Sequence, residues 1–280
     1  MRYGGSPFGG MTPVVKNLII INALFFLASV VFQSSFGIRI EDYLGLHVPM
    51  AEKFQPYQLI SYMFLHAYPS LTHIFFNMFA LFMFGRMLEM VWGPKKFLIY
   101  YFATGIGAAL IHLLTQYMEI VPVLKALNYY MNNATHENLQ MFLDNNFQIS
   151  SLEMQRNYQG FVTSYNSIFS IDPDKAIAIS KEFLFQWRID FLNAHVTVGA
   201  SGAVFGILLA FGMLFPNTQL MLLFPPIPIK AKWLVIIYGV MELFLGVANF
   251  SPNVAHFAHL GGMLFGFILI KYWQRKGNLY

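Results

Sequence analysis

The sequence predicts an all-α polytopic membrane protein: a bundle of six transmembrane helices with a helical extramembrane insertion between the third and the fourth. Of its 280 residues, 57% are hydrophobic and only 11% are charged, which is outside the range of soluble globular domains. The hydrophobic residues gather in runs of about 20, the length that spans the hydrocarbon core of a bilayer as a helix. These runs are Val15–Phe32, Leu71–Trp92, Phe97–Tyr117, Val196–Phe215, Trp233–Phe250 and Val254–Tyr272.

The first run is expected to stay in the membrane rather than to be removed as a signal peptide. Residues 1–14, which precede it, form a short tail rich in glycine and proline without a small-residue cleavage pattern. The chain has no cysteine, which excludes disulfides and thiolate chemistry. Residues 15–118 are expected to hold the first three transmembrane helices and the first outer loop, and residues 195–272 the last three.

The distribution of lysine and arginine predicts that both termini, residues 1–14 and 273–280, are cytoplasmic. Short cytoplasmic loops carry an excess of these residues, whereas the opposite short loops hold only Arg39 and Lys53. Anionic lipid headgroups account for this bias, so no nucleic-acid partner is expected, and the compact build favours a bacterial inner membrane. The residues on the positive side are Arg2, Lys16, Arg86, Lys95, Lys96, Lys230, Lys232, Lys271, Arg275 and Lys276.

Residues 119–194 differ in composition from the rest of the chain and are expected to form an extracytoplasmic insertion. They contain asparagine-rich and charged stretches, and no run among them is long enough to span a membrane. Ser150 and Glu153 have the spacing of a capping box, and Asp172 and Pro173 that of an N-cap followed by the first helical residue. The insertion is therefore expected to be helical, and its hydrophobic residues at helical spacing favour packing over a catalytic site.

Polar side chains inside the predicted helices mark the candidate site, because a polar group in hydrocarbon is costly and usually functional. Ser201 and His259 each lie five residues beyond the start of their runs, which puts both about 8 Å inside the outer end. His73 and Asn77 are spaced i,i+4 on one face, in the outer part of the second helix. The four side chains are therefore expected at one depth.

Each of these groups also has a structural or competing interpretation. The small residues of GASGAVFG, residues 199–206, are typical of close helix packing, and a serine among them often bonds its own helix backbone. His73, His256 and His259 could instead ligate a metal ion. His112 and Glu242 are further polar residues of the predicted helices, and both are interpreted as structural. A supporting role in the site is left open for Glu242.

Together the groups supply what nucleophilic catalysis needs: a hydroxyl, a neutral imidazole to take its proton, and donors for the oxyanion. Gly199 allows a tight turn before Ser201, and a helix N-terminus offers unpaired N–H groups to developing negative charge. His259 is preferred over His256 as the base, because small residues follow it on its own face and permit a close approach of the helices. The faces expected to meet are formed by Gly262 and Gly266 on the sixth helix and by Gly202 and Gly206 on the fourth.

Three motifs resemble those of the rhomboid intramembrane serine proteases. GASGAVFG, residues 199–206, resembles the GxSG motif, and AHLGGMLFG, residues 258–266, resembles AHxxGxxxG. HIFFN, residues 73–77, resembles the HxxxN of the second helix, and GRMLEMVWG, residues 85–93, resembles the segment that ends that helix. The resemblance covers all six predicted helices in order and implies a rhomboid-type bundle.

The resemblance implies a role for each site residue and a class of substrate. Rhomboids cleave membrane-anchored proteins in or next to their transmembrane helix, without a metal or other cofactor, so transmembrane proteins and the lipid bilayer are the expected partners. The fifth helix and the loop after it, with Phe244 and Phe250, would admit substrate sideways. The implied site consists of the dyad Ser201 (nucleophile) and His259 (general base), an oxyanion hole of Ser201 N–H, His73 and Asn77, Gly199 in the serine turn, and Phe205 packed beneath His259.

The chain departs from the rhomboid pattern in three places. Pro56, Tyr57 and Gln58 stand where many members have Trp-Arg, Phe205 stands where some have tyrosine, and residues 119–194 exceed what the core fold needs. A catalytically silent relative that acts as a binding or trafficking factor should lack the serine or the histidine, and this chain keeps both. A histidine-based metal-binding membrane protein remains the other alternative.

Overall fold

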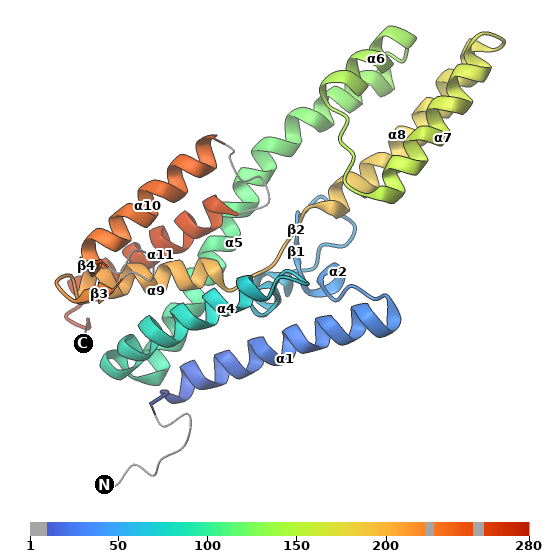
Figure 1. Ribbon diagram of the computed structural model, residues 1–280. Helices are drawn as coiled ribbons and strands as arrows, with labels where there is room; N and C mark the ends of the chain where they lie inside the picture. Colours follow the sequence, from blue (N-terminus) through green and yellow to red (C-terminus); the bar gives the residue numbers. More distant parts are fainter. Residues whose placement is uncertain (1–9, 222–226, 249–254, 280) are drawn as a thin grey trace. The chain divides into compact units, whose positions relative to one another are not determined.

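The computed structural model describes residues 10–221, 227–248 and 255–279, and most of them are helical (Figure 1). The chain divides into two compact units. The first contains Met1–Leu46, Pro56–His112 and Thr197–Tyr280, and the second contains His47–Gln55 and Leu113–Val196.

The first unit begins with α1 (Pro13–Phe36), which ends at Gly37 in the left-handed conformation with φ of 66°. Pro13 suits the first helical position, because its missing N–H would have no partner there. The carboxylate of Glu89, in the GRMLEMVWG segment, accepts hydrogen bonds from the Val14 and Val15 amides at 2.9 Å each. A buried negative charge thus caps the positive end of the α1 dipole.

Short helices lead from α1 to the second predicted span. They are α2 (Glu41–Leu44), α3 (Gln58–Ser61) and the 3₁₀ turn η1 (Tyr62–Phe64), and they are followed by α4 (Leu71–Ala80) and the π-helical η2 (Leu81–Gly85). Next comes α5 (Arg86–Asn132), which is kinked at Gly93, where φ is 75° and ψ is 166°. Only glycine adopts such a φ readily, and the kink falls between the second and third predicted spans.

α5 differs from the prediction at its far end, because the helix continues beyond Tyr117 to Asn132. It passes through Pro122, a residue that normally interrupts a helix. Beyond the kink, Ile120, Leu127 and Tyr130 are buried and pack in the hydrophobic core of the second unit. Tertiary packing therefore outweighs the cost of proline in this part of α5.

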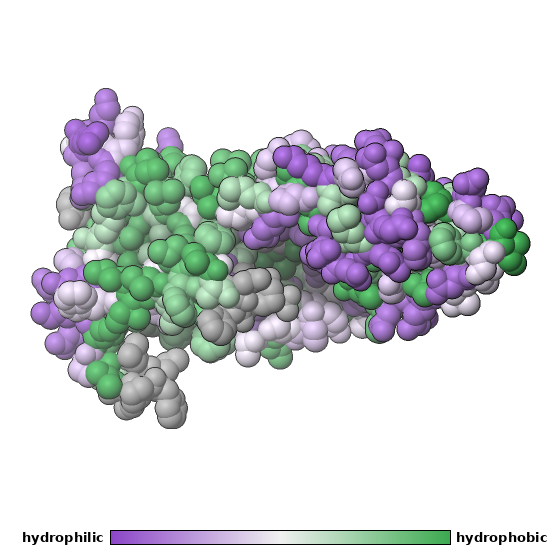
Figure 2. Space-filling view, turned by 90° about the horizontal axis from the view of Figure 1, so that it is seen from above, coloured by the Kyte–Doolittle hydropathy of each residue, from purple (hydrophilic) through white to green (hydrophobic). Residues whose placement is uncertain are grey.

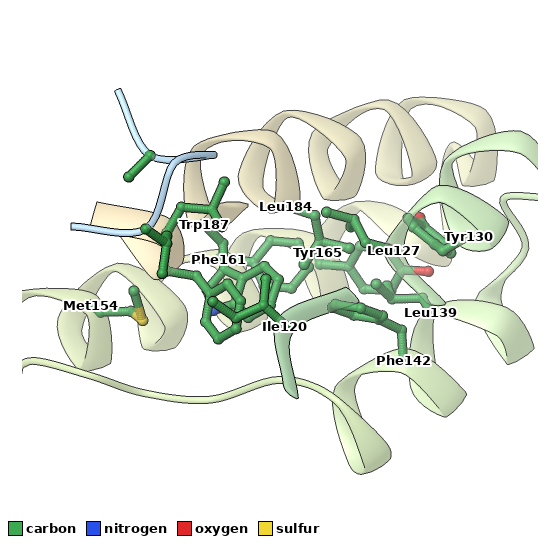
Figure 3. Packing of buried hydrophobic residues seen from close by; sticks show 14 of the residues in the cluster. Ile120, Leu127, Tyr130, Leu139, Phe142, Met154, Phe161, Tyr165, Leu184 and Trp187 are labelled. Atoms are coloured by element: carbon green, nitrogen blue, oxygen red, sulfur yellow. The ribbon is translucent and has the colours of Figure 1, made fainter. Parts of the chain in front are cut away.

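The second unit is completed by α6 (His136–Asn145), α7 (Leu152–Phe169) and α8 (Pro173–Ala194). Figure 3 shows buried side chains of these helices and of α5 converging on one core. The half-buried ring of Phe183 packs against this core and stacks on Phe161, with centroids 4.2 Å apart. The Asp172–Pro173 prediction is confirmed, since Asp172 accepts a hydrogen bond from the Lys175 amide at 3.0 Å. The Ser150 prediction was wrong by one residue, because Ser151 is the N-cap of α7 and accepts from the Met154 amide.

The last three predicted spans correspond to α9 (Ser201–Leu214), α10 (Ala231–Ala248) and α11 (His256–Arg275). The fourth begins at Ser201 rather than at Val196, because Val196–Thr197 form the short strand β2. The other strands are equally short: β1 (Leu46–His47), and β3 (Gln219–Met221) paired antiparallel with β4 (Pro228–Lys230). Phe250 and Val254, at the predicted ends of two spans, lie outside the described residues.

Three helical segments of the described chain are long and apolar enough to cross a membrane: Pro13–Phe36, Leu71–Asn132 and Ala231–Ala248. α9 is apolar but shorter. Figure 2 shows hydrophobic residues gathered on the surface of the first unit and hydrophilic residues on that of the second. The all-α prediction with several apolar helices is confirmed.

Candidate active site

The candidate site depends on a close contact between α9 and α11. A Cβ built on Gly262 would lie 1.8 Å from the carbonyl oxygen of Gly202, so only glycine fits there. The expected approach of the two glycine faces is therefore observed at Gly202 and Gly262, whereas Gly206 and Gly266 contact a third helix. A Cβ on Gly206 would meet Thr104 at 2.6 Å, and one on Gly266 would meet the Tyr100 hydroxyl at 2.3 Å. Gly206 and Gly266 thus allow α5 to pack closely against α9 and α11.

Ser201 is the first residue of α9 and follows a sharply turned segment. Gly199 has φ of 132°, a conformation that residues with a Cβ rarely adopt. Its amide donates to the Tyr62 carbonyl at 3.0 Å, and Thr197 shares a 2.7 Å hydrogen bond with His112. These bonds tie the turn to the surrounding helices, so His112 holds the chain that leads to Ser201.

His259 is placed against Ser201. Its Nε2 lies 2.8 Å from the Ser201 Oγ, and the residue as a whole is 9% exposed. The expected packing of Phe205 beneath His259 is confirmed, because the two rings stack with centroids 4.2 Å apart and planes inclined by 7°. The stack limits the rotation of the imidazole and excludes water from one of its faces.

His73 and Asn77 lie on α4, and the turn before Ser201 approaches the first of them. A Cβ on Gly199 would be 3.1 Å from both Cε1 and Nε2 of His73 and 3.6 Å from the Ser201 Oγ. His73 Nδ1 accepts from the Ala67 amide at 3.3 Å, so a neutral ring carries its proton on Nε2, at the edge near the turn. Asn77 is buried and donates one amide hydrogen to the His73 carbonyl at 2.9 Å.

Glu242 on α10 is the member of the site for which sequence analysis left the partner open. Its Oε2 lies 2.7 Å from Nδ1 of His256 and 2.9 Å from Nδ1 of His259. One carboxylate oxygen thus joins the two histidines of α11, and through His259 it is linked to Ser201. The donor atoms of Glu242, His256 and His259 lie within 4.8 Å of one another. In the described part of the chain, the group that could hold a metal ion with these two histidines includes Glu242, whereas the alternative interpretation had named His73.

His66, which sequence analysis did not single out, lies beside the site. Its ring is fully buried, and its centroid is 5.1 Å from that of His73. Burial, with a smaller contribution from the neighbouring His73, lowers the pKa of His66 to about 3. His66 is therefore neutral at physiological pH.

The structure describes one of the two phenylalanines assigned to substrate access, and it describes the first-loop residues that depart from the rhomboid pattern. Phe244 lies on α10 and is 62% exposed, whereas Phe250 lies outside the described residues. In the first loop, the Tyr57 hydroxyl and the Gln58 side chain donate to the Tyr43 carbonyl at 3.0 and 3.1 Å. The residues that replace Trp-Arg thus fasten this loop to α2.

Comparison with known proteins agrees with the motifs. The family model of the rhomboid domain matches residues 53–123 and 176–276, more than half of the chain. Rhomboid protein 1, mitochondrial, of Saccharomyces cerevisiae is 32% identical over 102 residues, which are 36% of this chain and 29% of that protein. The match thus spans less than a third of the length of the yeast relative, and no solved structure matches significantly. The chain is a multi-pass integral membrane protein that belongs to the rhomboid family.

Proposed function

We propose that this protein is an intramembrane serine endopeptidase that cleaves membrane-anchored proteins in or near their transmembrane segment. The observation that carries the proposal is the 2.8 Å contact between the Ser201 Oγ and the His259 Nε2 at the N-terminus of α9. A hydroxyl bonded to a neutral imidazole is the arrangement that activates a serine nucleophile. The chain belongs to the rhomboid family, whose members cleave substrates that are anchored in the same membrane as the protease.

The proposed reaction has two halves. Ser201 Oγ attacks the scissile carbonyl carbon while His259 Nε2 takes the hydroxyl proton, and the carbonyl oxygen becomes an oxyanion. As the C–N bond breaks, His259 returns that proton to the departing nitrogen and leaves an acyl-enzyme. Water then repeats the sequence, with His259 as base and the Ser201 oxygen as leaving group.

We assign oxyanion stabilisation to the Ser201 amide, His73 and Asn77. The first N–H groups of a helix have no intrahelical partner and lie at the positive end of its dipole, which suits Ser201 as the first residue of α9. The N–H edge of His73 near Gly199 supports its assignment. Asn77 donates one amide hydrogen to the His73 carbonyl, and we assign its second amide hydrogen to the oxyanion.

We further propose that six segments span the membrane: α1, α4 with η2 and the start of α5, α5 beyond Gly93, α9, α10 and α11. Residues 119–194 form an extracytoplasmic insertion, residues 1–14 and 273–280 are cytoplasmic tails, and the membrane is a bacterial inner membrane. The positive charges of the short loops support this orientation. The two family-matched stretches leave out residues 124–175, which fall inside the proposed insertion.

Cleavage of a model single-span substrate by the wild type and by Ser201→Ala tests the proposal. Ser201→Ala should abolish cleavage and covalent labelling by a fluorophosphonate while the protein still folds. Ser29→Ala is the control, because Ser29 is another serine of the first unit, buried on α1, whereas Ser201 is half-buried at the start of α9. Continued turnover by Ser201→Ala would rule out the serine mechanism.

The two alternatives make different predictions in the same assays. A silent binding or trafficking factor would neither cleave substrate nor react with a fluorophosphonate. A histidine-based metal-binding protein would retain stoichiometric zinc after purification and would be insensitive to Ser201→Ala. Metal analysis of the purified protein therefore separates the second alternative from the protease.

A further inference from the structure

One face of α10 packs against α11 through two glycines with a carboxylate between them. A Cβ on Gly239 would contact the Met263 side chain at 3.3 Å, and one on Gly246 would contact the His256 Cβ at 3.2 Å. Glu242 lies between these glycines at i+3 and i−4, on the same helical face. Its side chain is thus directed to α11, although α10 has an exposed apolar surface elsewhere.

The hydrogen bonds of Glu242 determine which ring nitrogens carry protons. The residue is 7% exposed, and an ionised carboxylate in such a place is tolerated only when donors satisfy it. Its Oε2 has two ring nitrogens within 2.9 Å, Nδ1 of His256 and Nδ1 of His259. A carboxylate accepts only, so both Nδ1 atoms are donors, and the Nε2 of each neutral ring is an acceptor. His259 Nε2 can therefore accept the Ser201 proton.

We propose that Glu242 is a positioning residue that fixes the tautomer and orientation of His259, and that His256 anchors the same carboxylate from its other side. The proposal rests on the proposed function and extends it, because the resemblance implies a serine–histidine dyad without a required acid. The function of the second histidine of α11 is thereby explained. His256 does not meet Ser201 but holds the group that orients the base.

Glu242 would act most strongly once the proton has moved. When the Ser201 oxygen bonds the carbonyl carbon, its proton passes to His259 Nε2 and the ring becomes a cation. Among the described residues, the polar and titratable groups that face this ring are Ser201 from α9, Glu242 from α10, His256 on α11 itself and His73 from α4. Among them Glu242 alone carries a negative charge, 2.9 Å from the Nδ1 of the cation, and it stabilises the cation without taking the proton.

The decisive variant is Glu242→Gln, which keeps the size of the side chain and removes its charge. We expect kcat to fall by roughly 100-fold or more, within the range attributed to a positioned acid–base group, with KM close to that of the wild type. Since the protonated ring loses its anionic partner, the acid limb of the pH–rate profile should move to lower pH. The rate of fluorophosphonate labelling should fall in parallel.

Glu89→Gln is the matched control for a purely structural carboxylate. Glu89 is also a buried glutamate of the first unit, and it caps α1 at a distance from the catalytic residues. This variant should lower the melting temperature but keep the kcat of the folded protein and its pH–rate profile. Glu242→Asp should restore part of the kcat lost in Glu242→Gln, because it returns the charge on a shorter side chain.

The outcomes separate this inference from the proposed function. If the wild type neither cleaves substrate nor labels, the proposed function is wrong. If the wild type is active and Glu242→Gln has the same kcat and pH–rate profile per folded molecule, the proposed function stands and the role of Glu242 is overturned. Should Glu242→Gln not accumulate, His256→Ala decides, since a wild-type kcat and pH–rate profile per folded molecule would overturn the anchoring of the carboxylate by His256, and a lowered kcat with a shifted acid limb would support it.

Discussion

Gly262 of α11 packs directly against the backbone of Gly202 of α9, where a Cβ on Gly262 would come within 1.8 Å of the Gly202 carbonyl oxygen. Ser201 precedes one of these glycines, and His259 lies one helical turn before the other. The separation of the two helix backbones at this contact therefore sets the distance between the serine and the imidazole.

Gly262→Ala should remove activity without touching a catalytic side chain. The added methyl group meets backbone, which cannot rotate away, so the helices must separate. Overpacking of this kind costs about 1–3 kcal/mol, and fluorophosphonate labelling of Ser201 should be lost. Gly160→Ala on α7 is the control, because a Cβ there meets no atom within 4 Å and alanine favours a helix. Labelling of Gly262→Ala at the wild-type rate would contradict this account.

The proximity of Ser201 and His259 could be predicted from their positions along two hydrophobic runs, and their side chains lie 2.8 Å apart. The expected position of Ser201 inside its helix was wrong, because α9 begins at Ser201 itself, whereas His259 is the fourth residue of α11. The kink at Gly93 falls in the gap between the second and the third hydrophobic run. The kink depends on one glycine and is local in the sequence, whereas the start of α9 depends on the short strand β2 that precedes it.

The contacts between helices were harder to predict, because they depend on the rotation of each helix about its axis. The partners of Glu242 were left open, although Gly239 and Gly246 on the same face mark the side that approaches another helix. Gly206 and Gly266 were expected on the faces where the fourth and sixth helices meet, and the contacts that they make with α5 were not foreseen. The passage of α5 through Pro122 depends on the core of the second unit, which no local pattern reveals.

The two histidines of α11 should respond differently to substitution. His259→Ala removes the acceptor of the Ser201 proton and should abolish turnover and labelling. His256→Ala leaves the 2.8 Å contact between Ser201 and His259 in place and should only weaken turnover, because Glu242 loses one of its two donors. Substrate cleavage by both purified variants checks this. Full activity of His259→Ala with loss in His256→Ala would transfer the role of base to His256.

Alanine at His73 or Asn77 should lower kcat more than it raises KM. Their donors are proposed to meet charge that exists only in the transition state, and such interactions accelerate the reaction without tightening substrate binding. Loss of one oxyanion donor typically costs roughly 100- to 1000-fold in kcat. Steady-state kinetics with a model substrate measure the effects on kcat and KM separately. An unchanged kcat in both variants would count against these assignments.

His66 predicts a specific dependence of stability on pH. Its pKa is about 3 in the folded protein against 6.5 for an ordinary histidine, so below pH 6.5 the unfolded chain binds a proton that the folded protein does not. This contribution to stability is complete above pH 6.5 and is lost as the pH falls from there toward 3. Melting temperatures across this range should therefore fall less steeply for His66→Gln than for the wild type. Parallel curves would show that His66 titrates normally.

The absence of cysteine allows a direct test of the proposed orientation. Ile171 lies between α7 and α8 within the proposed insertion and is 84% exposed. Lys276 follows α11 in the proposed cytoplasmic tail. A membrane-impermeant maleimide should label Ile171→Cys in intact cells and Lys276→Cys only after permeabilisation.

Both variants should cleave substrate as the wild type does, which verifies that the labelled molecules are folded. The cysteine-free wild type gives the background of the assay. The positive charge of the short loops is the physical basis of this prediction, since lysine and arginine are retained on the cytoplasmic side. Labelling of Lys276→Cys in intact cells, with Ile171→Cys protected, would invert the orientation and place the Ser201 end of α9 toward the cytoplasm.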